Sequence, residues 1–422
     1  MEHSCLFRIS DFVLRIFRFL LCFFIFDPYN AAMNFVGTAS SKIPIPEQAA
    51  RTAARQALEK AGITRADTVL FFLTSDYKKH YEKIAAEIKT VTGAKNIVGA
   101  SAGGVLTDQE EIEKQAGLCV MAMNTPDIDT HSFLIPNLQE SSFRAGEKTA
   151  QHLRETQTSA NLMLLFPDPF SFKSTHFFEG FEQNYEYVPM TGAAAGENGK
   201  EEKTYQFENG KVFFDAVAGV SFGGNFRSEI GITRSCQPFG EALKVTRAEG
   251  NMIYEIEGRP AYDILLESLS AIEFENPDQL FQRVFLGMPT RSFQTDFNQN
   301  FLIRNIMGIN TKKGMLSTVS PVEEGEFLTF TVRDPKLARA DLQRMLSDMK
   351  GRFDDQPPGF GFYFNCCARG QQLYSEPNHD INLIRETFPQ VPIIGFSGYG
   401  ELAPLDHVNH LHQHCGVLTL IS

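Results

Sequence analysis

Val69–Tyr77 reads VLFFLTSDY, and the same pattern returns at Leu162–Phe170 (LMLLFPDPF) and Gly359–Gly370 (GFGFYFNCCARG). A helix-like stretch, a glycine-containing apolar segment and a last apolar segment follow each of these runs. Continuous apolar runs of this length are typical of buried strands. Because internal repeats determine architecture, we interpret the three stretches as the first strands of three copies of one unit.

The three copies agree in their spacing. The first strand and a later glycine are separated by 30 residues from Val69 to Gly99, by 30 from Leu162 to Gly192, and by 33 from Phe362 to Gly395. Each copy predicts a strand, a helix, a strand, a glycine-rich turn and a final strand. A turn between buried strands favours glycine, because a residue without Cβ can adopt positive φ and lets another backbone segment come close. The alternative is an anion-binding nest of N–H groups, but a nucleotide loop would need a helix directly after the glycines.

The region at about 225–350 differs from the repeats. Its alternating apolar residues and the turn at Glu249-Gly250-Asn251 predict a β-hairpin followed by a helix from Arg259. Asp334-Pro335 predicts the start of another helix. The expected fold is therefore mixed α/β (α+β): three repeated strand–helix–strand–strand units in mixed sheets, plus an inserted β-hairpin and helix region.

Composition narrows the possible classes of protein. The 422 residues are 43% hydrophobic and 21% charged, which are globular values. The net charge is −12, whereas proteins that bind nucleic acids carry basic surfaces, so this class of protein is disfavoured. The seven cysteines contain no CxxC pair, which disfavours a zinc ribbon and suits free thiols in a reducing cytoplasm.

Residues 1–32 differ in composition from the rest. Their uncharged apolar run, Phe19–Phe26, is too short to span a bilayer. A disordered leader or over-extended start is favoured over a signal or anchor segment and over a folded part of the domain. We expect the mature domain to begin near Met33 and no stable membrane span.

Several motifs together resemble the FIST family, over about residues 34–422. The N-terminal match is VLFFLTSDY with IVGASAGGVLTD at Ile97–Asp108, and the C-terminal match is more specific. It comprises the run Asn365–Gly370 (NCCARG), Ile394-Gly395-Phe396, Gly400–Pro404 (GELAP), and Asn409–His412 before a final strand. The chain departs from the family at His414-Cys415, where relatives often carry Thr.

The resemblance implies a FIST N-terminal domain at 33–224 and a FIST C domain at 225–422. It also implies a cytoplasmic sensory or signal-transduction protein, not an enzyme, that binds a small ligand such as an amino acid or derivative. No cofactor or metal is expected, and output is expected through a downstream signalling protein. Eukaryotic relatives attach these domains to an F-box, so an interaction scaffold without a small ligand stays an alternative.

Arg369 and Glu401 are the pair that we expect to clamp a ligand. Each follows a strand of the third copy, Arg offers a fork for a carboxylate, and Glu can accept from an ammonium. The alternative is an internal salt bridge. The motif residues complete the predicted ligand site: Arg369, Glu401, Cys367, Asn365, Gly370, Gly395, Phe396, Gly400, Asn409, His410 and His412.

Two other chemistries stay open for the third copy. Cys366 or Cys367 could be the nucleophile of a thiol hydrolase or amidase, with His410 or His412 as base, although free cysteine usually fills apolar space. On a strand the two adjacent cysteines would point to opposite faces. The run His407–Cys415 contains four histidines and could form a metal half-site. The alternative is a polar loop that binds no metal.

Overall fold

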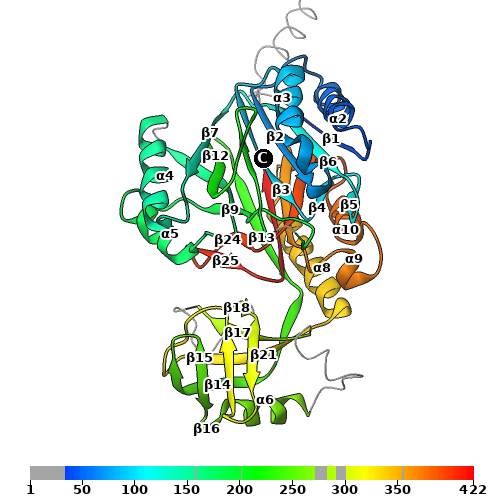
Figure 1. The fold of residues 1–422 in the computed structure, drawn as a ribbon. Helices are drawn as coiled ribbons and strands as arrows, with labels where there is room; N and C mark the ends of the chain where they lie inside the picture. Colours follow the sequence, from blue (N-terminus) through cyan, green and yellow to red (C-terminus); the bar gives the residue numbers. More distant parts are fainter. Residues whose placement is uncertain (1–33, 157–158, 201, 271–282, 291–300, 354–355) are drawn as a thin grey trace, which may run out of the picture. The chain divides into compact units, whose positions relative to one another are not determined.

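The computed structural model describes residues 34–422 except 157–158, 201, 271–282, 291–300 and 354–355. Three six-stranded mixed sheets and one eight-stranded sheet contain the strands of this part of the chain (Figure 1). The predicted mixed α/β fold with three repeated units is confirmed. The leader proposed for residues 1–32 lies outside the described residues.

The three six-stranded sheets share one strand order. The first sheet runs β1 (Phe35–Ser41), β6 (Leu118–Asn124), β2 (Thr68–Thr74), β3 (Asn96–Ala102), β10 (Gln206–Glu208), β11 (Lys211–Phe213). The second runs β7 (Ile128–Pro136), β12 (Ala216–Gly224), β8 (Ala160–Pro167), β9 (Met190–Ala193), β24 (Glu401–Leu405), β25 (Val408–His412). The third runs β13 (Ser228–Arg234), β26 (Cys415–Ile421), β22 (Phe360–Cys366), β23 (Ile393–Gly398), β4 (Gly104–Thr107), β5 (Glu111–Glu113). In each, the predicted first strand (β2, β8 or β22) is parallel to the strand on one side and antiparallel to the strand on the other.

Each unit is larger than the sequence predicts. An additional strand and helix precede the predicted first strand: β1 and α2 (Pro46–Ala61), β7 and α4 (Ser142–Thr156), β13 and α8 (Pro335–Arg352). The predicted crossover helices are α3 (Tyr81–Thr92), α5 (Ser174–Glu182) and α10 (His379–Thr387). The short helices η1 (Ser75–His80) and α9 (Gln371–Tyr374) follow the first strands of units one and three.

The three units exchange strands in a cycle. The strand after the glycine segment leaves its own sheet, so that β4 pairs with β23, β10 with β3, and β24 with β9. Equivalent backbone bonds close the ring, from Gly103 N to Ser397 O, from Gly196 N to Ser101 O, and from Tyr399 N to Ala194 O. Each sheet therefore contains strands of two units.

Equivalent phenylalanines of the three first strands meet in the core. The ring centroids of Phe72 and Phe166 are 5.1 Å apart, those of Phe72 and Phe364 6.0 Å, and those of Phe166 and Phe364 5.7 Å. The Phe396 ring packs against all three. The Phe-rich composition thus supplies the centre around which the three sheets pack.

The repeated glycines lie within strands, which corrects their prediction as turn residues. Gly99, Gly192 and Gly395 each pair with the first strand of their unit. A Cβ on Gly395 would lie 1.6 Å from the carbonyl oxygen of Tyr363, and the distances at the other two sites are 2.1 and 2.2 Å. Close backbone approach therefore explains the glycines.

Residues Cys236–Arg333 form an insertion between β13 and α8. Its eight-stranded sheet contains β18 (Phe301–Arg304), β17 (Val284–Pro289), β21 (Phe327–Arg333), β14 (Cys236–Glu249), β15 (Met252–Ile256), β20 (Met315–Thr318) and β19 (Ile306–Asn310), with β16 (Arg259–Pro260) on β15. The predicted hairpin is β14–β15. The predicted helix is α6 (Ala261–Leu269), which begins two residues later than expected because Arg259 and Pro260 form β16.

The predicted start of α8 is confirmed. Asp334 caps the helix, since its Oδ1 accepts from the backbone N–H groups of Lys336 (2.8 Å) and Leu337 (3.0 Å). This cap fixes the point at which the chain leaves the insertion, immediately after Arg333 at the end of β21.

Candidate functional site

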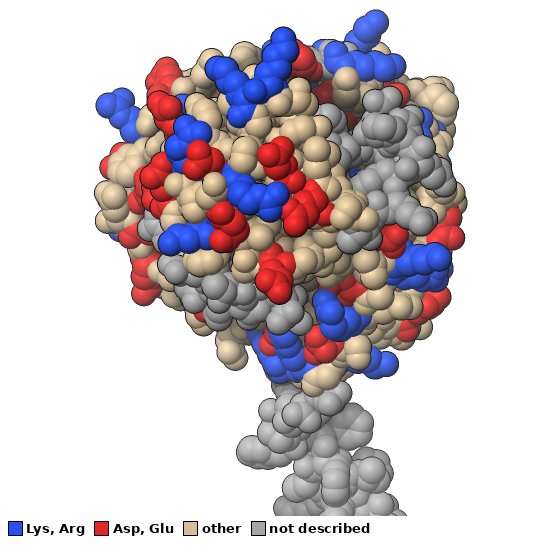
Figure 2. Space-filling model, turned by 90° about the horizontal axis from the view of Figure 1, so that it is seen from below, with Lys and Arg blue, Asp and Glu red and all other residues tan. Residues whose placement is uncertain are grey.

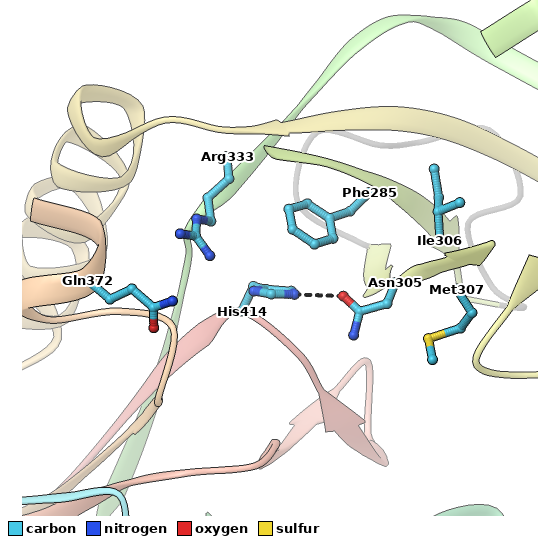
Figure 3. A pocket seen from close by; sticks show the side chains of 7 residues that line it. All are labelled: Phe285, Asn305, Ile306, Met307, Arg333, Gln372 and His414. Carbon is cyan, nitrogen blue, oxygen red and sulfur yellow. Dashed lines mark hydrogen bonds between the residues drawn. The ribbon is translucent and has the colours of Figure 1, made fainter. Parts of the chain in front are cut away.

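A cavity of about 670 Å³ lies where strands of the insertion approach the third unit. Seven side chains of described residues, from five separate chain segments, line it (Figure 3): Phe285 of β17, Asn305, Ile306 and Met307 at β18–β19, Arg333 of β21, Gln372 of α9, and His414 between β25 and β26. A volume of this size is within the range of small-molecule sites.

Arg333 supplies the positive charge of the cavity wall. It is the last residue of β21, where it pairs with Cys236 of β14, and the Asp334 cap follows directly. Its side chain is half-buried and has no hydrogen-bond or ion-pair partner among the described residues. An unpaired guanidinium at a cavity is a ready partner for a carboxylate, because its planar fork can donate two parallel hydrogen bonds.

His414 stands opposite Arg333 in a neutral state. It occupies a turn with φ of 55°, and its ring packs on Phe285 at a centroid distance of 4.2 Å. Its Nε2 lies 2.9 Å from Oδ1 of Asn305, which identifies Nε2 as the protonated nitrogen (Figure 3). Burial, together with the charge of Arg333, lowers the pKa of His414 to about 4. Among the described residues that line the cavity, Arg333 therefore carries the single full charge at neutral pH.

Gln372 and the apolar residues complete the wall. Gln372 is exposed on α9, which follows Gly370 with φ of 56°. A Cβ on Gly370 would lie 2.2 Å from Oε1 of Glu113, so glycine permits this close approach. Phe285 and Ile306 are buried, whereas Met307 is 61% exposed. The wall can thus hold a carboxylate at Arg333, hydrogen-bond a polar group through Gln372, and contact an apolar portion of a ligand.

Arg369, the first residue of the predicted clamp, has internal partners. It is 1% exposed and donates from Nε to Oδ2 of Asp380 at 2.8 Å and from Nη2 to Oδ1 at 3.2 Å. Its Nη1 donates to Ser235 Oγ and its Nη2 also to Tyr374 OH. This network joins the end of β22 to α9 and α10.

Glu401, the second residue of the clamp, is fully buried in β24. Its Oε2 accepts from the backbone N–H of Cys415 at 3.2 Å, and its Oε1 has no partner among the described residues. Burial, and then the proximity of Cys366, raise the pKa of Glu401 well above its ordinary value. No hydrogen bond or ion pair joins Arg369 to Glu401 within the described ranges.

The remaining predicted residues support the third unit. Asn365 accepts at Oδ1 from Ser397 Oγ at 2.7 Å, and Phe396 lies in the core. Gly395 and Gly370 permit the close approaches already described, and Gly400 has φ of 123° just before β24. Cys367 follows β22 and is partly exposed.

Asn409, His410 and His412 lie on β25. Asn409 accepts from Met190 N at 2.9 Å and donates to Val188 O at 3.0 Å, which ties β25 to the second unit. His412 Nε2 contacts Ala403 O at 3.1 Å, and burial lowers the pKa of both histidines, to about 4 for His410. Across the described chain, no group of three or more His, Cys, Asp or Glu side chains has metal-binding geometry. The assignment of the eleven motif residues to a ligand stays a prediction.

Sequence reasoning missed most of the cavity. Of its lining residues only His414 was singled out, as part of the histidine run. Phe285, Asn305, Met307, Arg333 and Gln372 come from segments without a repeated or clustered motif. The only local signal was the position of Arg333 directly before the capped start of α8.

On the face that Figure 2 shows, acidic and basic side chains are interspersed instead of gathering by sign. Within the described ranges, no helix combines the length and apolarity that crossing a bilayer requires.

Comparisons with known proteins identify the family. The FIST N domain model matches residues 67–259, and the FIST C domain model matches residues 261–404. An uncharacterized protein of Mycobacterium tuberculosis is 27% identical over 391 residues, which are 91% of this chain and 99% of the relative. An uncharacterized protein of Mycobacterium bovis is 24% identical over 387 residues, 91% of this chain and 98% of the relative.

Two solved structures show a distant likeness. A cyanuric acid hydrolase from A. caulinodans has a TM-score of 0.27 and 10% identity, covering 46% of this chain and 72% of the hydrolase. A chorismatase has a TM-score of 0.32 and 8% identity, covering 92% of this chain and 98% of that structure.

Proposed function

Because the chain belongs to the FIST family, we propose that it is a sensory protein that binds a small carboxylate, such as an amino acid or derivative, and signals through a partner protein. The observation that carries the proposal is the guanidinium of Arg333 at the cavity, which has no hydrogen-bond or ion-pair partner among the described residues. The second arginine considered for this role, Arg369, already uses Nε and both terminal nitrogens on Asp380, Ser235 and Tyr374.

The ligand class follows from the chemistry of the wall. Arg333 is the charged group, so an anion is favoured over a cation, and its fork favours a carboxylate. Phe285, Ile306 and Met307 suit an apolar side chain or ring. Gln372 can donate or accept, so it can contact an amino or hydroxyl group beside the carboxylate.

A thermal-shift screen followed by calorimetry tests this function. The probes are amino acids, their deaminated analogues and their decarboxylated amines. Binding to the native state alone raises Tm, so we expect shifts with carboxylates and none with the amines. Arg333→Ala should abolish the shift, and Arg333→Lys should weaken affinity about tenfold or more because the fork is lost.

Arg247→Ala is the matched control. Arg247 belongs to the same inserted sheet, pairs with Glu255 at 2.9 Å and lies outside the cavity. Its loss should leave affinity unchanged. A carboxylate that binds Arg333→Ala as tightly as the wild-type chain would place the ligand elsewhere and overturn the proposal.

A further inference from the structure

Two adjacent cysteines meet at the end of β22. Cys366 is the last residue of the strand, and the chain turns directly after it, since Arg369 N donates to Cys366 O at 2.8 Å. Cys367 N donates to Gly398 O at 3.0 Å. The two thiols are close enough to interact, and each influences the ionisation of the other. The expectation that they point to opposite faces applies only while a chain continues as a strand, and β22 ends at Cys366.

The two thiols differ in access. Of the five cysteines in the described ranges, Cys367 alone is partly exposed, whereas Cys119, Cys236, Cys366 and Cys415 are buried. The interaction with Cys366 lowers the pKa of Cys367, and the same interaction together with burial raises the pKa of Cys366. An accessible thiol that ionises more readily is suited to attack, and a buried neighbour is suited to resolve the product.

We propose that Cys366 and Cys367 form a redox-active vicinal dithiol, which a low-molecular-weight disulfide such as oxidised glutathione converts to an intramolecular disulfide. The Cys367 thiolate attacks one sulfur of the small disulfide, forming a mixed disulfide and releasing one thiolate, which takes up a proton. The Cys366 thiol then loses its proton and attacks the Cys367 sulfur, forming the Cys366–Cys367 bond and releasing the second small thiol. The protein loses two electrons and two protons, and the small disulfide becomes two thiols.

The neighbouring backbone holds Cys366 in place for the second step. Its sulfur lies near the backbone N–H groups of Ala368 and His414 and near the Cys367 thiol. Adjacent Cα atoms are about 3.8 Å apart, shorter than the separation that most disulfides span. The bond should therefore be strained and readily reduced, as in regulatory disulfides and unlike structural ones.

The test exposes the reduced full-length chain to oxidised glutathione, alkylates the remaining thiols with a maleimide, and maps the peptides by mass spectrometry. We expect the peptide that contains both cysteines to lose two hydrogens, to remain unalkylated, and to recover both thiols after dithiothreitol. Peptide mapping separates this event from reactions of Cys5 and Cys22.

Single variants test the order of the two steps. Cys366→Ala should stop at a stable glutathione adduct on Cys367, because the resolving thiol is absent. Cys367→Ala should leave Cys366 unmodified, because it is buried. Cys119→Ala, which removes a buried thiol from another strand, should behave like the wild-type chain. A persistent glutathione adduct on wild-type Cys367, a bond from it to another cysteine, or no reaction of the pair would each overturn the proposal.

Discussion

Arg369 and Asp380 form a fully buried, two-bond ion pair, with Nε–Oδ2 and Nη2–Oδ1 distances of 2.8 and 3.2 Å. Asp380 also accepts at Oδ2 from Tyr363 OH at 2.6 Å. Burial by itself would raise the pKa of Asp380, but the charge and hydrogen bonds of Arg369 outweigh it and lower that pKa. The pair therefore fastens α10 to the strand end that carries the most specific family motif.

Replacing Asp380 with Asn should destabilise the fold by about 3–5 kcal/mol, because it leaves a buried guanidinium without its counter-charge. Urea unfolding followed by circular dichroism measures the loss. Glu267→Gln is the control, since the Arg259–Glu267 pair is on the surface, with both side chains more than half exposed, and should change stability little. Equal stability of Asp380→Asn and wild type would contradict a structural role for the pair.

Arg369→Lys separates the structural role of this arginine from the predicted ligand clamp. Lysine keeps the charge but cannot reproduce the bonds to Asp380, Ser235 and Tyr374 together. We expect a lower Tm without ligand and an unchanged affinity for any carboxylate that depends on Arg333. A normal Tm with selectively weakened binding would instead support Arg369 as the ligand residue.

Gly395→Ala should be among the most disruptive small substitutions in the chain. Its Cβ would overlap the carbonyl oxygen of Tyr363, so β22 and β23 would have to separate, at a loss of about 3 kcal/mol or more. Gly351→Ala is the opposite case. Apart from its chain neighbours and the backbone of α8, no described atom lies within 4 Å of the added Cβ, and alanine favours helix. Thermal unfolding of both variants checks this, and a wild-type Tm for Gly395→Ala would contradict the close approach.

The repeated core of the fold could be predicted from the sequence because its signals are local and occur three times. Buried first strands, crossover helices and glycines recur at nearly constant spacing. The start of α8 was predicted, but the sequence did not reveal that a strand and a helix open every unit. In the third unit the insertion separates β13 from α8, which hides the repeat. The exchange of β4, β10 and β24 was also missed, because the chain gives no local sign of which distant strand each will pair with.

The candidate site was harder to predict than the fold. The family motifs point to Arg369, Glu401 and Asn409 as ligand residues. In the fold these three side chains are buried and form hydrogen bonds to other parts of the chain. The cavity side chains Arg333 and Gln372 are of types that are common on protein surfaces. They form a candidate site only because the fold places them at the same cavity. Whether a cation has a partner is a property of the folded chain, and no spacing rule reports it.

Glu111 should make the fold less stable as pH rises. Burial, and then the charge of Asp380, raise the pKa of Glu111 to about 8 from an ordinary 4.5. Between these two pH values the folded chain holds a proton that the unfolded chain releases, so the free energy of unfolding falls as pH rises through this window. Glu111→Gln keeps an acceptor for Ile381 N, which lies 2.8 Å from Glu111 Oε1, but cannot titrate. Its stability relative to wild type should increase from pH 5 to pH 8.5, and a constant difference would contradict the raised pKa.

His410 should make the fold less stable as pH falls, which is the opposite pH dependence. Burial, and then the charge of Arg304, lower the pKa of His410 to about 4 from an ordinary 6.5. Between pH 6.5 and 4 the unfolded chain binds a proton that the folded chain excludes, so the stability associated with the neutral ring falls as pH falls. His410→Gln removes this titration and should lose less stability than wild type between pH 7 and pH 4.5. Urea unfolding at both pH values gives the loss of stability of each chain. Because Glu111 is common to both chains, its contribution cancels in the comparison. An equal loss in the two chains would show that His410 titrates normally in the folded state.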